Sequence, residues 1–114
     1  MIWAVVLAAG ESKRMGTQKL LLPFGDTTVV GAVVRAARAS RVDRVLAVLG
    51  ADRERVRAEL ERHGLDEPIE KVKLAFAVNE DFASGMLSSI QTGFKVLPAD
   101  AKAAVVMLGD QPFL

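Results

Sequence analysis

Four short runs of mostly aliphatic residues are spaced along the chain, and each is followed by a segment that contains glycine, an acid or asparagine. Within each run the apolar residues are continuous and do not alternate with polar ones. Continuous runs of this length are typical of β-strands covered on both faces, as in a parallel sheet. The pattern therefore predicts four buried strands, at residues 5–7, 45–49, 74–78 and 105–108.

Between the first three runs, apolar residues recur at helical spacing. Thr27 or Thr28 can cap a first helix, because apolar residues follow the i, i+3, i+4, i+7 rule from residue 30 onward. Asp52 can cap a second, highly charged helix whose end is marked by the His-Gly pair at 63–64. Its charge run is typical of a solvated helix face.

A third helix is predicted between the last two strands. It begins near Gly85, places Ile90, Phe94 and Leu97 on one face, and stops before Pro98. The resulting order of strands and helices alternates strictly. It predicts an α/β fold of the Rossmann-like, three-layer α/β/α kind, with a mostly parallel sheet and right-handed crossovers. Ligands of such sheets bind outside the carboxyl ends of the strands, which directs attention to residues 8–19, 50–52, 79–89 and 109–112.

Composition narrows the chemistry. The 114 residues, 51% of them apolar, are enough for one globular domain. The chain has no cysteine, which excludes thiolate catalysis and Cys-ligated metals. It has one histidine, so Ser-His-Asp catalysis is excluded unless His63 takes part. The apolar start lacks a basic flank and is too short for a membrane span, so we interpret it as a strand and expect a cytoplasmic protein.

Charge is distributed unevenly between the two halves. Residues 1–50 contain seven Lys and Arg against three acids, whereas residues 51–114 contain eight against eleven. This imbalance is too small to predict binding to nucleic acid or to a membrane surface. It indicates instead a local anionic ligand near the N-terminus.

The segment 7–19 contains the densest chemical pattern. Small residues directly after a strand let the backbone N–H groups approach a ligand, and Lys13, Arg14 and Lys19 add positive charge to the same loop. Together they suit a polyphosphate, although neither the Walker nor the dinucleotide fingerprint is present. The alternative is a solvated loop with three ordinary surface cations.

Two further strand ends contain candidate residues. Asp110 directly follows the last strand, and a carboxylate at this place suits Mg²⁺. The alternative is that Asp110 caps the turn before Pro112. Asn79 follows the third strand, and Gly85 to Ser89 begin the next helix with free amides and hydroxyls that can bind a base and a ribose. The alternative here is a helix cap that uses Ser84 or Ser88. Glu80 and Asp81 are interpreted as an acidic loop.

At these residues the sequence resembles the MobA-like nucleotidyltransferases, and among them the MocA-type molybdenum cofactor cytidylyltransferases. The resemblance rests on the segments at residues 7–16 and 19–23, on Asn79 with residues 85–89, and on residues 109–112. It implies the N-terminal portion of a nucleotide-diphospho-sugar-transferase-like fold. It also implies an enzyme that moves CMP, or alternatively GMP, from the triphosphate to a phosphorylated acceptor such as molybdopterin, with release of pyrophosphate.

The resemblance also assigns roles to single residues. Arg14 and Lys19 would hold the phosphates, and Asp110 would bind Mg²⁺; these three form the catalytic set. The expected contacts to the nucleotide come from the first loop and from the third strand end: Leu7, Ala8, Ala9, Gly10, Arg14, Lys19, Asn79, Gly85 and Ser89. The pair of alanines before Gly10 favours CTP over GTP, since GTP users of this pathway tend to have glycine there.

Members of the family continue well beyond the Gly-Asp-x-Pro motif, whereas this sequence stops at Leu114. We therefore expect residues 1–114 to be the nucleotide-binding portion of one MobA-like domain, inactive alone and able to self-associate through an exposed sheet edge. Two alternatives stay open. One is a nucleotide-binding fragment without catalysis, and the other is a cytidylyl- or uridylyltransferase of the same fold that acts on a sugar phosphate, phosphocholine or an isoprenoid precursor.

Overall fold

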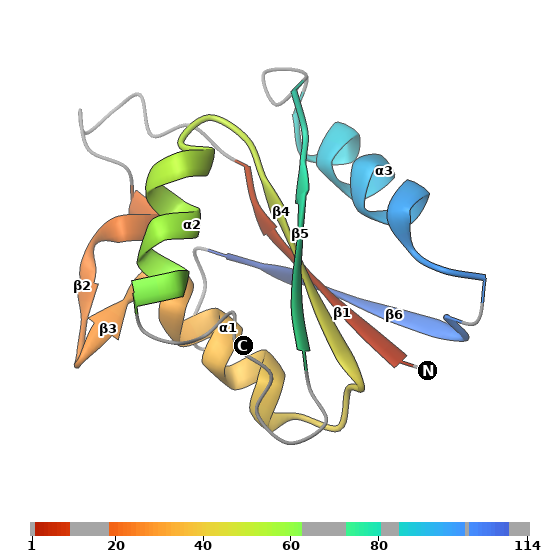
Figure 1. The fold of residues 1–114 in the computed structure, drawn as a ribbon, viewed down its shortest axis with the longest axis horizontal. Helices are drawn as coiled ribbons and strands as arrows, with labels where there is room; N and C mark the ends of the chain where they lie inside the picture. Colours follow the sequence, from red (N-terminus) through yellow and green to blue (C-terminus); the bar gives the residue numbers. More distant parts are fainter. Residues whose placement is uncertain (1, 10–18, 63–72, 81–84, 100, 110–114) are drawn as a thin grey trace.

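The fold is built on a four-stranded parallel sheet with the strand order β5-β4-β1-β6 (Figure 1). In this computed structural model the described residues are 2–9, 19–62, 73–80, 85–99 and 101–109. The strands are β1 (Ile2–Ala8), β4 (Arg44–Leu49), β5 (Lys73–Val78) and β6 (Ala103–Leu108). The helices are α1 (Val29–Ala39), α2 (Arg53–Arg62) and α3 (Met86–Val96). The predicted α/β class, the parallel sheet and all four strands are confirmed.

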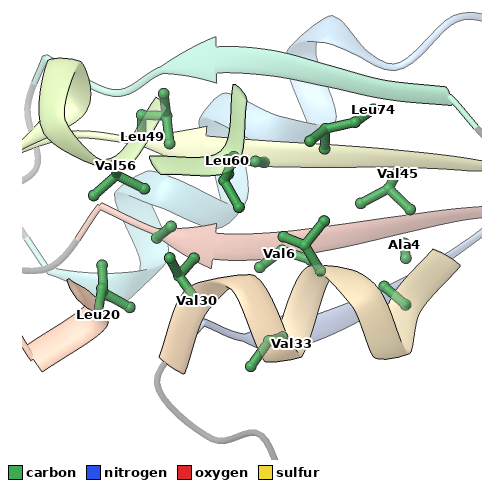
Figure 2. Close-up of a cluster of buried hydrophobic side chains, with 14 residues drawn as sticks. Ala4, Val6, Leu20, Val30, Val33, Val45, Leu49, Val56, Leu60 and Leu74 are labelled. Atoms are coloured by element: carbon green, nitrogen blue, oxygen red, sulfur yellow. The ribbon is translucent and has the colours of Figure 1, made fainter. Parts of the chain in front are cut away.

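Helices α1 and α2 cover one face of the sheet, and α3 covers the other (Figure 1). The first helix begins where the sequence predicts it, because the Thr28 hydroxyl accepts a hydrogen bond from Gly31 N–H at 3.2 Å. On this face β1 contributes Ala4 and Val6, and α2 contributes Leu60 (Figure 2). Small residues on the strands and branched residues on the helices let the two layers approach closely.

The third helix corrects one prediction. Ile90 and Leu97 pack against the sheet as expected, but Phe94 does not and is 50% exposed. The residue next to it, Gly93, faces the sheet instead: a Cβ built there would lie 2.9 Å from Val5 Cγ1. The close approach of α3 to the sheet leaves no space for a side chain at position 93, so the apolar face of the helix is rotated relative to the prediction.

The edge strand β6 corrects another prediction, which was that all strands are covered on both faces. Val105 is 50% exposed and Val106, whose side chain points to the opposite face, is also exposed. Within the described residues β6 pairs only with β1, so its apolar residues have no neighbouring strand on the other side. The exposed sheet edge that the sequence predicts is therefore present in the described part of the chain, and self-association through it stays a prediction.

A small antiparallel hairpin lies between β1 and α1 and was not predicted. It consists of β2 (Pro23–Phe24) and β3 (Thr27–Thr28), joined by a turn in which Gly25 has a φ of 63°. Before it, η1 (Lys19–Leu21) forms a single 3-10 turn, from which Leu20 enters the core beside α1 (Figure 2). A backbone hydrogen bond connects the start of the hairpin to the start of α1, because the Val29 N–H donates to the carbonyl of Leu22 at 3.0 Å.

Candidate functional site

The carboxyl ends of all four strands meet at one edge of the sheet. Along this edge the paired residues are Val78 with Leu49, Leu49 with Ala8, and Leu7 with Leu108. The chain crosses from β4 and β5 on one side of β1 to β6 on the other, so the order reverses at β1 and β6. Open α/β sheets bind their ligands in the crevice at such a reversal. The edge above β1 and β6 is therefore the place for a site.

A backbone hydrogen bond joins the ends of β1 and β6 at a glycine. Gly109 N–H donates to the Leu7 carbonyl at 2.9 Å. A Cβ at position 109 would lie 2.6 Å from that carbonyl oxygen and 3.4 Å from the Ala8 side chain, so only glycine fits. On the other side of β1, the Ala9 carbonyl accepts a hydrogen bond from Ala51 N–H at 3.3 Å. Small residues thus line the start of the first loop.

A buried polar cluster occupies the same edge at the end of β5. Asn79 is only 3% exposed, and its carboxamide nitrogen donates to the hydroxyls of Ser88 at 2.9 Å and Ser89 at 3.0 Å. Its backbone N–H donates to the Leu49 carbonyl at 2.7 Å. Gly85 precedes α3 with a φ of 102°, which favours glycine. Three of the predicted residues, Asn79, Gly85 and Ser89, therefore lie together, joined by one that we did not select, Ser88.

The helix-cap alternative for this segment is resolved for Ser88. The N-cap of α3 is Gly85, and no side chain forms a hydrogen bond there as a cap. The Ser88 hydroxyl instead donates back to the Gly85 carbonyl at 2.7 Å. Ser84 lies outside the described residues. The pair of adjacent serines in residues 85–89 could have predicted that Ser88 belongs to this cluster, because both lie in the first helical turn and can reach the end of the preceding strand.

A polar cleft of about 490 Å³ lies at the ends of β4 and β5. It is lined by residues 50–55 and by Glu80. Arg53 crosses it to pair with the Glu80 carboxylate at 3.3 Å, and both side chains are at least half exposed. An exposed pair contributes little to stability. Glu80 is thus part of a surface ion pair, in agreement with the interpretation of this segment as an acidic loop.

Several residues that the sequence analysis considers lie outside the described part of the chain. These are Gly10, Lys13, Arg14, Asp81 and Asp110. The backbone of Lys19 belongs to η1, directly before the hairpin, and its side chain is likewise outside the description. The described residues contain no group of three or more His, Asp or Glu side chains able to hold a metal. Among the same residues, no helix is long and apolar enough to cross a membrane.

Comparison with known proteins decides the family. The family model described as the MobA-like NTP transferase domain matches residues 4–114. The chain belongs to this family. Among curated relatives, the purine catabolism protein PucB of Bacillus subtilis is 34% identical over 114 residues, covering 96% of this chain and 53% of PucB. The bifunctional protein GlmU of Kineococcus radiotolerans is 37% identical over 113 residues, covering 96% of this chain and 21% of GlmU.

Solved structures support the same membership. A nucleotidyl transferase from Methanothermobacter superposes with a TM-score of 0.79 and is 29% identical, covering 100% of this chain and 52% of that one. Rv0371c from Mycobacterium tuberculosis superposes with a TM-score of 0.75 and is 34% identical, covering 99% of this chain and 53% of that one. A second structure of Rv0371c is a complex with manganese. The chain therefore spans about half the length of PucB and of these solved chains, and about a fifth of GlmU.

Proposed function

We propose that the protein transfers CMP from CTP to a phosphorylated acceptor, molybdopterin, and releases pyrophosphate. The observation that supports this proposal best is the gathering of all three sequence motifs at one sheet edge. Ala8 ends β1 and Ala9 follows it, Gly109 follows β6, and the cluster around Asn79 follows β5. Adjacent strands are about 4.8 Å apart, so the edge from β5 to β6 extends over roughly 14 Å. It can take the nucleoside near β5 and the phosphates near β1 and β6.

From the order of the motifs along the edge, we assign each motif to the part of the nucleotide that it would bind. The segment after β1 has small residues and leads into the loop with Arg14 and Lys19, which we assign to the phosphates. The cluster at the start of α3 offers hydroxyls and backbone amides, which we assign to the base and ribose. Selection of CTP over GTP rests on Ala8 and Ala9, because the resemblance associates glycine at these positions with the use of GTP.

We assign the divalent cation to the end of β6. Gly109, which directly precedes Asp110 in the chain, is held against β1 by its bond to Leu7. A carboxylate is the hard oxygen ligand that Mg²⁺ prefers, and Mg²⁺ completes its shell with phosphates and water. Asp110 would hold Mg²⁺, which when bound would stabilise the negative charge on the transferred and leaving phosphates.

The reaction needs no protein nucleophile. An oxygen of the acceptor phosphate forms a bond to the α-phosphorus of CTP, while the bond from that phosphorus to the bridging oxygen of the β-phosphate breaks. Pyrophosphate leaves with that electron pair. Arg14 and Lys19 stabilise the charge that develops on the equatorial and leaving oxygens. Positioning and electrostatics account for the rate, which suits a chain without cysteine and with one histidine.

The test uses the full-length protein that contains this chain. It is incubated with Mg²⁺, molybdopterin and either CTP, GTP or UTP, and pyrophosphate release is measured. We expect release that requires the acceptor and is fastest with CTP. Parallel reactions replace molybdopterin by a sugar phosphate, by phosphocholine or by an isoprenoid phosphate. Release with one of these and not with molybdopterin would refute the acceptor, and no release with any combination would refute the transferase function.

A further inference from the structure

An apolar side chain connects the turn that contains Lys19 to the ends of β1 and β6. Leu20 is the second residue of η1 and is 4% exposed, whereas Leu21, the next residue, is only partly buried. Leu20 belongs to the same buried cluster as Ala8 and Val30, and η1 contacts both α1 and α2 (Figure 2). The side chain of Leu20 therefore anchors this turn in the core.

The tip of Leu20 lies where the two strand ends are bonded to each other. A Cβ built on Gly109 would lie 3.3 Å from Leu20 Cδ2 and 3.4 Å from the Ala8 side chain. Gly109 also donates its N–H to the Leu7 carbonyl at 2.9 Å. Because glycine has no side chain, the space beside it is open, and Leu20 packs there against the backbone at the end of β6.

This contact lies between two residues to which we assign charged roles. Lys19 directly precedes Leu20 and is assigned to the phosphates of the nucleotide. Consecutive Cα atoms are about 3.8 Å apart, so the position of Leu20 determines where the backbone of Lys19 lies. Gly109 directly precedes Asp110, which is assigned to Mg²⁺. The contact between Leu20 and Gly109 is thus one residue away in the chain from each of the two charged groups.

The turn is held at its other end as well. The Leu22 carbonyl accepts a hydrogen bond from the Val29 N–H at 3.0 Å, so the segment after Leu20 is tied to the start of α1. Buried side chains are close-packed and cannot shift without displacing their neighbours. Electrostatic stabilisation of a transition state requires charges that are held in place before the reaction. A lysine next to a buried anchor meets this requirement better than one in a solvated loop.

We propose that Leu20 is a positioning residue: by packing against Gly109 it keeps Lys19 in register with the end of β6, so that Lys19 and Asp110 act on the same phosphates. This inference rests on the proposed function and adds to it a residue that is buried away from nucleotide and metal. Leu20 acts through Lys19, and its effect on the reaction is separable from its effect on stability.

The test compares variants of the full-length protein in the presence of Mg²⁺. For each variant we measure the unfolding midpoint in urea, kcat and KM for CTP, and the Kd for CTP by calorimetry. Leu20→Ala is expected to lower the midpoint and to lower kcat about ten- to hundredfold, because a misplacement of about 1 Å can cost a factor on the order of a hundred. The Kd should rise less than about threefold, since the misplaced charge acts mainly in the transition state.

Leu60→Ala is the matched control, because Leu60 is fully buried in the same cluster but lies on α2. It should lower the unfolding midpoint comparably and leave kcat within about twofold of wild type. Leu20→Met keeps an apolar side chain of nearly the same volume and should retain kcat within about threefold. In the Lys19→Ala background, Leu20→Ala should lower kcat by less than about threefold more, while its effect on the midpoint persists, because residues that act through one contact are not additive.

Three outcomes would overturn the inference. They are a kcat of Leu20→Ala close to that of wild type, an equal loss of kcat in Leu60→Ala and Leu20→Ala, and fully multiplicative losses in the double variant of Lys19 and Leu20. Each of them leaves the proposed function standing if the wild-type protein releases pyrophosphate in a reaction that requires the acceptor. A wild-type protein that releases none with any nucleotide and acceptor refutes the proposed function, and this inference with it.

Discussion

The close approach of β1 and β6 at Gly109 predicts a substitution that damages the site and the fold together. In Gly109→Ala the new Cβ would lie 2.6 Å from the Leu7 carbonyl oxygen, and ordinary contact begins at 3.4 Å. The two strand ends must therefore separate by about 0.8 Å. The neighbour is backbone and cannot rotate away. Positive φ occurs only at Gly25 and Gly85 among the described glycines, so the cost at Gly109 is steric.

Forcing a methyl group into such a contact costs about 1–3 kcal/mol of unfolding free energy. The displacement also reaches the catalytic residues that we propose, because Asp110 follows Gly109 directly. A misplacement of about 1 Å at a reacting centre can cost on the order of a hundredfold in rate. We therefore expect Gly109→Ala to lower the turnover of the full-length enzyme roughly ten- to hundredfold.

The assay measures unfolding in urea and pyrophosphate release at saturating nucleotide on the same preparation. Gly93→Ala is the matched control, because its Cβ would lie 2.9 Å from Val5 and 3.2 Å from Val48, on the α3 face and away from the strand ends. Part of its steric cost is offset by the better helix propensity of alanine, about 1 kcal/mol. Wild-type turnover in Gly109→Ala, or an equal loss of turnover in Gly93→Ala, would refute the reasoning.

Further predictions concern the hairpin, the core and the phosphate loop. Thr27 Oγ1 is buried and has no hydrogen-bond partner in the described part of the chain, so Thr27→Val should raise the free energy of unfolding in urea by about 1 kcal/mol. The matched Thr28→Val loses the cap to Gly31 and should lower the same free energy by about 1 kcal/mol; of two shifts of equal sign, the one with the wrong sign would contradict its assignment. Leu60 is 0% exposed, and Leu60→Ala should lower the free energy of unfolding by about 2–5 kcal/mol, whereas a change below 1 kcal/mol would mean that α2 is loosely packed. Lys19→Ala should lower pyrophosphate release at saturating nucleotide at least about tenfold, and a near-normal rate would show that the phosphate site is misplaced.

The strands could be predicted from the sequence because each is a continuous apolar run between helical segments. For β1 and β4, which have strands on both sides, the prediction of two covered faces is confirmed by alternation: Ala4 and Val6 face α1, while Val5 and Leu7 face α3. For β6 the same pattern was misleading. Whether a run of apolar residues is central or at an edge depends on strand order, which no local pattern encodes.

Two local features were missed for physical reasons that can be stated. The hairpin strands are two residues each, too short to show a period of two, and only the turn residue Gly25 signals them. In α3, periodicity alone places Phe94 on the apolar face. The decisive factor is the distance between helix and sheet, which leaves no space for a side chain at Gly93 and rotates the helix.

The grouping of three candidate residues was predictable, but their hydrogen bonds were only partly so. Asn79, Gly85 and Ser89 could be selected because polar residues follow a buried strand, and the structure brings them together. Their hydrogen-bond order could not be predicted, since it depends on which hydroxyl reaches the Gly85 carbonyl. The ion pair between Arg53 and Glu80 was also beyond sequence reasoning, because it joins residues from different strand ends.

The fate of the α-phosphorus of CTP tests the central claim most directly. The full-length protein is supplied with Mg²⁺, molybdopterin and CTP labelled with ³²P at either the α- or the γ-position, and the products are separated. Nucleotidyl transfer predicts that the α-label enters the acceptor product and the γ-label leaves in pyrophosphate, in equal amounts. Transfer of the γ-label to the acceptor, or release of both labels without an acceptor product, would contradict the account.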